Sequence, residues 1–312
     1  MYARTVIRYY TPTIWELATE KPYMKFILAA RRKPEDTQEK YFYEWSIIHV
    51  ALMITNPSTQ RAFTRYAQHY TINGVSGDLL WHPLSPMGWD NMADHWLDKF
   101  EDLAASVRSE DYIRRMQPHQ FGDSNFVVEL TDGRTIYESA DFRNGGVKLV
   151  QFLEVRPGLS QEEFDDRWYR QHAPLVQDAL RPLGILRKYV QNPKLALDPQ
   201  FFRGTLFEAG GVGQHGGIEE YWFNSLDDLV LLRRSPAWDR VKSSYSGLTA
   251  ETGSFSMVTT ERVVFDYVTP GRQTPRAAVL TPGTLEALID AQGYADFNVP
   301  KPPRSSSTTT ES

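Results

Sequence analysis

The stretch Pro157–Gln191, "PGLSQEEFDDRWYRQHAPLVQDALRPLGILRKYVQ", has a counterpart at Pro34–Gln68, "PEDTQEKYFYEWSIIHVALMITNPSTQRAFTRYAQ", at a constant offset of 123 residues. Aligned without a gap, eight of the 35 positions are identical, whereas ordinary residue frequencies would give roughly two. The identical pairs are Pro34/Pro157, Gln38/Gln161, Glu39/Glu162, Trp45/Trp168, His49/His172, Leu52/Leu175, Tyr66/Tyr189 and Gln68/Gln191. The chain therefore contains an internal repeat, and this repeat decides the fold.

A second repeated block follows each of these stretches, at an offset of 126 residues. Its identical pairs are Trp96/Trp222, Asp102/Asp228, Leu103/Leu229, Arg108/Arg234 and Ser109/Ser235. We therefore predict two copies of one domain at residues 23–139 and 146–270. Residues 1–22 form an N-terminal extension, with a possible strand and short helix. Residues 271–312 form a C-terminal extension, with a helix from about Thr284 and a polar end that is predicted to be disordered from about residue 303.

The order of elements in each copy is predicted to be strand, helix, strand, strand, helix, strand. Lys25–Arg32 and Lys148–Val155 are apolar runs typical of first strands. Phe164, Trp168, His172 and Leu175 recur at helical spacing on one apolar face. The strands that follow alternate, with Tyr and Gln two residues apart on one side. This βαββαβ order predicts an α+β fold of tandem ferredoxin-like domains.

The second copy also resembles a known family. Phe164, Trp168, the run His172-Ala173-Pro174-Leu175-Val176, Gly184, Tyr189 and Gln191 are similar to the signature of EthD-domain proteins, which belong to the dimeric α/β-barrel superfamily. The first copy departs from it, because Val50-Ala51 follow His49 and Arg61 stands at the position of Gly184. The resemblance implies that the two sheets join into one pseudo-dimeric barrel within a single chain. It also implies kinship with cofactor-free cyclases, dehydratases and oxygenases that act on polyketides and aromatic compounds.

Composition excludes several classes of function. The net charge is −5 without any basic tract, so nucleic acid is not an expected partner. No apolar run is long enough for a membrane span, and the first residues lack the core of a signal peptide, so we expect a cytoplasmic protein. The chain has no cysteine, and its histidines lack metal-site spacing. We predict no metal and no cofactor, with haem as the alternative that the superfamily leaves open.

A glycine-rich segment, Gly211, Gly213 and Gly216, matches the spacing of a dinucleotide-binding loop. The residues after it predict a strand where that motif requires a helix, so we expect a flexible hairpin or lid loop. The first copy has "LLWHPLSPMGW" in the matching place. Both loops are candidates to roof the cavity of the barrel, and His82 or His215 would then contact a ligand.

The catalytic prediction centres on His172 and Tyr189. A neutral histidine on the inward helix face can act as general base, and a tyrosine on the facing strand can donate to an oxyanion. We expect His172 to face the barrel cavity. The competing interpretation is structural: a histidine on an apolar helix stripe is often a core residue, and both copies keep the His and Tyr.

Other residues are predicted to bind the substrate, namely His49, Tyr66, Gln68, Gln191, Trp168, Trp81 and His82. The predicted function is acid/base-catalysed dehydration or cyclisation of a carbonyl or phenol substrate in secondary metabolism. The alternatives are a non-catalytic carrier of a hydrophobic aromatic ligand and a cofactor-independent oxygenase. The expected partner is a small hydrophobic molecule, and the chain is compatible with a monomer or a homodimer.

Overall fold

The computed structural model describes residues 23–116, 121–271 and 273–275. The first copy consists of β1 (Tyr23–Arg32), α1 (Gln38–Tyr43), the π-helical turn η1 (Glu44–His49), α2 (Val50–Ile54), α3 (Pro57–Ala62), β2 (Phe63–Thr71), the short helix η2 (Gly77–Leu79), β3 (Asn91–Leu97), α4 (Phe100–Val107), α5 (Glu110–Met116) and β4 (Gly122–Glu138). Its α1 begins after Thr37, whose side chain accepts a hydrogen bond from the backbone N–H of Lys40.

The second copy repeats this order. It consists of β5 (Val147–Leu153), α6 (Gln161–Arg167), the π-helical turn η3 (Trp168–His172), α7 (Ala173–Leu180), η4 (Arg181–Leu183), β6 (Lys188–Pro193), η5 (Pro199–Phe202), β7 (Gly211–Val212), β8 (Gly217–Phe223), α8 (Leu226–Arg234), α9 (Pro236–Tyr245) and β9 (Phe255–Asp266). Ser160 and Glu163 form a reciprocal capping box at the start of α6.

The two sheets join into one closed barrel. Each copy has the ferredoxin-like strand order, β4-β1-β3-β2 in the first and β9-β5-β8-β6 in the second. The long strands β4 and β9 continue into the other copy, where β4 pairs with β6 and β9 pairs with β2, all antiparallel. An eight-stranded antiparallel barrel therefore closes within the described part of this one chain, and the short β7 adds to β4 in parallel. The prediction of an intramolecular pseudo-dimeric α/β barrel is confirmed.

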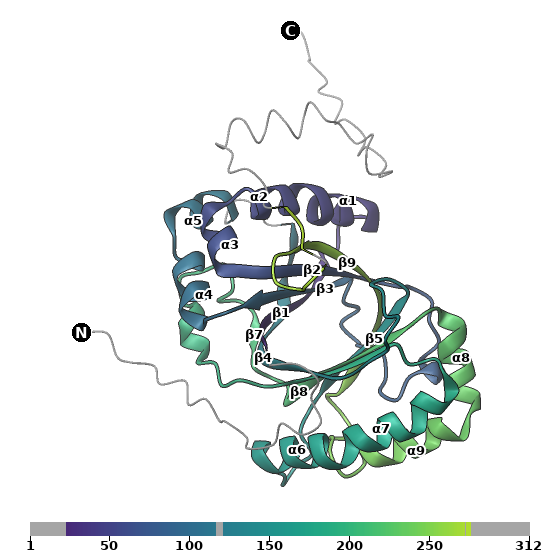
Figure 1. Ribbon diagram of the computed structural model, residues 1–312. Helices are drawn as coiled ribbons and strands as arrows, with labels where there is room; N and C mark the ends of the chain where they lie inside the picture. The colour runs from purple at the N-terminus through teal and green to yellow at the C-terminus, as the bar shows by residue number, and fades with distance from the viewer. Residues whose placement is uncertain (1–22, 117–120, 272, 276–312) are drawn as a thin grey trace.

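Helices cover the barrel on two opposite sides (Figure 1). Helices α1–α5 lie over the first sheet and α6–α9 over the second. Each helical layer packs an apolar core on its own sheet, around Trp45 and Leu103 in the first copy and around Trp168 and Leu229 in the second. These pairs occupy equivalent places in the repeat, so the repeated residues build equivalent cores.

The barrel lumen is charged at one end. Lys25 and Lys148, equivalent residues of β1 and β5, each place Nζ 2.7 Å from a different oxygen of Glu220. Lys25 also pairs with Asp94 at 3.3 Å, and Lys148 with Glu261 at 3.4 Å. All five side chains are almost fully buried, so the two copies are tied together by mutually satisfied charges rather than by apolar contacts alone.

The long loops cross between the copies. In the first copy the loop between β2 and β3 carries Trp81, whose ring stacks on Trp238 of α9 at a centroid distance of 5.2 Å. In the second copy the loop between β6 and β8 carries Phe207, whose ring meets Phe26 of β1 edge-on at 5.3 Å. Each loop thus covers the helical side of the other copy.

At the end of the lumen away from the charges, both loops also reach the barrel interior. Trp89 of the first loop packs with Ile27 and Phe152, and the His215 ring of the second loop meets Phe152 edge-on at 5.3 Å. Ile27 and Phe152 point into the lumen, since they lie at even spacing from Lys25 and Lys148 on the same strands. The expectation that both loops roof the lumen is therefore confirmed at this end.

The glycine-rich segment begins in the short strand β7 and continues as a loop into β8, the strand that the sequence predicts after it. The expected elements in residues 1–22 and beyond residue 275 lie outside the described residues. None of the described helices is both long enough and apolar enough to cross a membrane.

Candidate functional site

A buried glutamine, tyrosine and tryptophan form the same arrangement in both copies. In the first copy the amide of Gln68 donates to the Tyr66 hydroxyl at 3.0 Å and to the backbone carbonyl of Trp45 at 3.1 Å. In the second, Gln191 makes the same two bonds to Tyr189 and Trp168; these are 2.8 and 3.1 Å long. The carbonyls that accept belong to π-helical turns, where the regular helical ladder is interrupted. The glutamine amide gives a donor to a carbonyl in each interrupted helix, and this structural role explains why both copies keep these residues.

Glu219 on β8 is the centre of the second copy's arrangement. Its Oε1 accepts from the Trp168 indole and, at 2.7 Å, from the Tyr189 hydroxyl. Its Oε2 accepts at 2.9 Å from Tyr221 and at 2.6 Å from Tyr245. The carboxylate is fully buried, yet its pKa is lowered to about 2: burial opposes the charge, and the nearby His172 and these donors outweigh burial.

His172 lies in this same layer between helix and sheet. Its Nδ1 is 2.8 Å from the Ser244 hydroxyl and its Nε2 is 3.1 Å from Oε1 of Glu219. Glu219 points outward to the helices, whereas its neighbour Glu220 points into the lumen, since side chains alternate along a strand. The prediction that His172 faces the barrel cavity is therefore wrong, and neither His172 nor Tyr189 lines any of the three cavities described here.

Trp81 and His82 also belong to the second copy's side. The Trp81 indole donates to the backbone carbonyl of Trp238 at 3.3 Å, and the His82 ring meets Tyr245 edge-on at 4.6 Å. Burial lowers the pKa of His82 to about 4. These two residues, together with Trp168 and Gln191, pack the closed second copy; none of the four lines the cavities described here.

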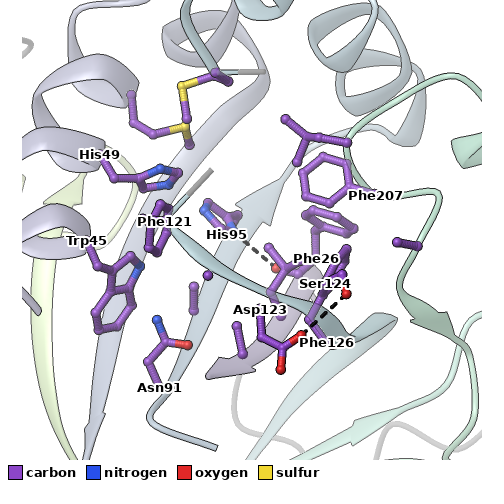
Figure 2. Close-up of a pocket in the computed structure, with 18 of the residues that line it drawn as sticks. Phe26, Trp45, His49, Asn91, His95, Phe121, Asp123, Ser124, Phe126 and Phe207 are labelled. Carbon is purple, nitrogen blue, oxygen red and sulfur yellow. Dashed lines mark hydrogen bonds between the residues drawn. The ribbon is translucent and has the colours of Figure 1, made fainter. Parts of the chain in front are cut away.

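The equivalent region of the first copy is open, with a cavity of about 290 Å³ between helices and sheet. Figure 2 shows the aromatic rings that surround it. We call it the aromatic cavity; its lining includes Phe26, Trp45, His49, Asn91, Ala93, His95, Tyr112, Phe121, Asp123, Phe126 and Phe207. Phe207 comes from the second copy's crossing loop, so both copies build the cavity. Its volume is at the lower end of about 300–1,000 Å³ for ligand sites, which suits a compact aromatic ligand.

His49 is the one predicted substrate-binding histidine that lines the aromatic cavity. Its ring lies 5.1 Å from the ring of Phe121, which walls the cavity on the same side in Figure 2. Tyr66 and Gln68, the other predicted contacts of this copy, lie behind this wall and do not line the cavity. At the cavity wall Asp123 binds Arg31 at 2.8 Å.

His95 on β3 is the residue that the sequence analysis missed. Its Nδ1 lies 3.3 Å from the backbone carbonyl of Phe26, an acceptor, so Nδ1 carries the proton. Nε2 then presents a lone pair, and no described residue donates to it. Burial lowers the pKa of His95 to about 4, so the ring is neutral near neutral pH. The histidine is 3 % exposed and stacks on Tyr66 at 4.5 Å.

A single exchange between the copies explains the open cavity. Strands β1 and β3 pair Leu28 with Ala93, and the equivalent strands β5 and β8 pair Gln151 with Glu219. In the second copy the Glu219 side chain and its donors fill the layer between helix and sheet. In the first copy Ala93 has only a methyl group there, and a cavity is left. The offset of 126 residues aligns Ala93 with Glu219 in the sequence. The signal available was therefore an acidic residue in one copy aligned with an alanine in the other.

Two further cavities lie elsewhere. One, of about 670 Å³, is at the charged end of the lumen, where Lys25, Arg65 and the lumen carboxylates neutralise one another. The other is a small surface hollow around Phe100 and Arg108. Across the part of the chain that the structure describes, no three His, Cys, Asp or Glu side chains gather in a way that would hold a metal ion.

Comparisons with known proteins agree with the fold. Residues 156–244 match the family model of the EthD domain. An anthrone oxidase-like protein has a similar structure, with a TM-score of 0.51 and 12 % identity over 84 % of this chain and 98 % of that chain. No curated protein matches the sequence.

Two further structures are more weakly similar. A candidate monooxygenase from Lactobacillus acidophilus has a TM-score of 0.41 and 8 % identity, covering 78 % of this chain and 96 % of that one. A mutant chlorite dismutase from Candidatus Nitrospira defluvii has a TM-score of 0.43 and 11 % identity, covering 79 % and 94 %. At these identities the similarity is one of fold, and the chain is built as a dimeric α/β barrel.

Proposed function

We propose that the chain is an oxidoreductase that binds a compact aromatic substrate in the aromatic cavity and removes a proton from it with His95. The observation that carries the proposal is the Nε2 lone pair of His95, which is buried, held neutral and without a donor among the described residues. A neutral imidazole with a fixed tautomer is the basic form that proton abstraction requires. The cavity supplies the apolar surroundings that aromatic rings prefer.

The reaction class is taken from the similar fold of an anthrone oxidase-like protein. In such a reaction a methylene group that is conjugated through its aromatic rings with a ketone loses a proton to the base. The resulting carbanion gives its electrons to dioxygen, a carbon–oxygen bond forms, and the peroxide anion takes the proton back from the base to give a hydroperoxide. Loss of water from the hydroperoxide leaves a second carbonyl, so one oxygen atom enters the product and the other leaves as water. The oxidant is dioxygen, and the protein supplies the base and the apolar site.

The test uses anthrone with an oxygen electrode and mass analysis of the product. We expect oxygen uptake and a product one carbonyl richer, and a loss of about 10²–10⁴ in rate for His95→Ala. His82→Ala is the matched control, because His82 is a buried histidine with a similarly lowered pKa that packs against the second copy. An equal rate for wild type and His95→Ala, with both folded, would overturn the proposed role of His95.

A non-catalytic carrier is the second candidate. The mainly apolar lining of the aromatic cavity favours it, since retention of an aromatic ligand needs no base. Binding of anthrone without conversion would support this reading. The predicted dehydratase or cyclase shares the proton abstraction but needs no oxidant, so it would act under nitrogen on a hydroxylated aromatic substrate that can lose water, which anthrone cannot.

A further inference from the structure

The second copy indicates which chemical group fits the aromatic cavity, because a side chain of that copy occupies the equivalent position. The two copies have the same strand register: Tyr66 lies opposite His95 as Tyr189 lies opposite Tyr221. Both ring pairs are stacked, at 4.5 and 4.6 Å. The position of the Glu219 carboxylate among its donors can therefore be transferred to the first copy.

The donors remain in the first copy, but the carboxylate does not. In the second copy the Tyr189 hydroxyl accepts from Gln191 and donates to Glu219. In the first copy the Tyr66 hydroxyl accepts from Gln68, and it takes a side-chain hydrogen bond from Trp45 as well. No acceptor for the proton of Tyr66 is present among the described residues, although the side chain is fully buried.

A hydroxyl that only accepts is an unsatisfied donor, and burial makes this costly, by about 1–3 kcal/mol for a typical group. The empty volume over Ala93 is where the second copy places an oxygen anion. Tyr66 does not line the cavity itself, but its neighbours Trp45 and His95 do, as does Ala93. By the template of the second copy, a ligand oxygen in the position of the Glu219 carboxylate would lie where the Tyr66 hydroxyl can donate to it.

We infer that the substrate of the aromatic cavity carries an ionisable hydroxyl group, a phenol or an enol, whose oxygen takes the place of the Glu219 carboxylate. The Tyr66 hydroxyl donates to this oxygen, and the hydroxyl of the ligand donates to Nε2 of His95. This inference rests on the proposed function only in using the same cavity as the substrate site. Tyr66 is then the group that stabilises the anion after His95 accepts the proton.

The arrangement selects a hydroxyl over a carboxylate. In the second copy Tyr221 donates to Glu219, so that copy accepts a carboxylate. In the first copy the equivalent residue is His95, which presents a lone pair. A carboxylate would face that lone pair without a proton to offer, whereas a phenol or enol has one. The exchange of Tyr221 for His95 accompanies the exchange of Glu219 for Ala93.

The test measures the binding of para-nitrophenol, whose phenol and phenolate forms absorb differently, and it needs no turnover. The readout is the pKa of the bound probe, compared between wild type and variants. Tyr66→Phe removes one hydrogen bond to the anion, so it should weaken phenolate binding about tenfold or more and raise the pKa of the bound probe. A purely structural tyrosine would change stability and leave the pKa of the bound probe where it is.

A second pair of variants keeps the test decisive if Tyr66→Phe fails to fold. Ala93→Glu reproduces the second copy's arrangement and should abolish binding of para-nitrophenol, whereas Ala93→Ser leaves the cavity open and should bind it. The probe para-nitroanisole, which lacks the hydroxyl, should bind at least tenfold more weakly. Equal binding of the two probes, or an unchanged pKa of the bound probe in folded Tyr66→Phe, overturns the inference.

The two proposals fail separately. If para-nitrophenol binds through Tyr66 but anthrone is not oxidised, the oxidase is wrong and the hydroxyl site stands. If anthrone is oxidised with His95 but Tyr66→Phe changes neither its rate nor the pKa of the bound probe, the hydroxyl site is wrong and the oxidase stands.

Discussion

Glu219→Gln is the change that tests most directly how the closed second copy is held together. The carboxylate accepts from Trp168, Tyr189, Tyr221 and Tyr245 and faces His172 at 3.1 Å. Its pKa falls from 4.5 to about 2 in the folded chain. At roughly 1.4 kcal/mol per pKa unit, the ionised form is worth about 3 kcal/mol to folding. The glutamine keeps the shape of the side chain but loses its charge. Its amide NH₂ group is a donor, and it would face hydroxyl and indole groups that are donors too.

We therefore expect Glu219→Gln to lower the free energy of unfolding by about 3 kcal/mol near neutral pH, measured by urea denaturation. The sign of the pH dependence follows from the lowered pKa. The stabilisation is complete above the unfolded pKa of 4.5 and is lost as the pH falls towards about 2. The difference between variant and wild type should therefore shrink in acid.

Glu101→Gln provides the comparison, because Glu101 is an exposed residue of α4 and its replacement should change stability by less than about 0.5 kcal/mol. A Glu219→Gln protein as stable as wild type would refute the argument. A loss of stability that stays constant from neutral pH to about pH 3 would refute it as well, since the charge would then not be its source.

Three further predictions follow from the two copies. Binding of para-nitrophenol in the aromatic cavity should persist in mild acid and fall as the pH drops through about 4, where His95 protonates and loses its lone pair, and a spectrophotometric titration measures this. Phe207→Ala should enlarge the aromatic cavity and admit a larger aromatic probe, while costing about 3–5 kcal/mol of stability by calorimetry or denaturation. Lys25→Met should destabilise the chain by about 3–5 kcal/mol, because Glu220 and Asp94 lose a buried partner, and an unchanged urea midpoint would contradict this.

The fold was predictable because the residues that pack each helix on its sheet recur in both copies of the repeat. The pairs Trp45/Trp168 and Tyr66/Tyr189 are needed in each copy to pack a helix on a sheet, so duplication preserved them. Strand and helix order followed from local periodicity, which depends on neighbouring residues alone. Closure of the barrel followed from the family resemblance and from the exposed apolar faces that two separate sheets would leave. The crossing of the long loops was not predictable, because their aromatic residues have no period that indicates a partner.

The candidate site was predicted in the wrong copy, for a physical reason. The residues that match the family pattern best, around His172, are those that the structure packs most tightly. The pattern of identities drew attention to what both copies share, and shared residues are the ones that the fold itself requires. The open cavity depends on a difference, Ala93 against Glu219, and on His95, which has no counterpart histidine in the second copy. A search of the repeat for exchanges of charge, rather than for identities, would have found both.

The hydrogen bonds of Glu219 in the closed second copy explain what the open first copy lacks. A buried carboxylate surrounded by three tyrosines and a tryptophan is costly to build, because each hydroxyl must find its acceptor. In the second copy Glu219 provides that acceptor within the chain, so the region is satisfied and has no use for a ligand. The first copy keeps Tyr66 and Trp45 but gives up the acid, and the cost of the unused donor persists until something else supplies an oxygen. The empty volume over Ala93 is therefore the place where we propose that a ligand supplies the oxygen that Glu219 supplies in the second copy.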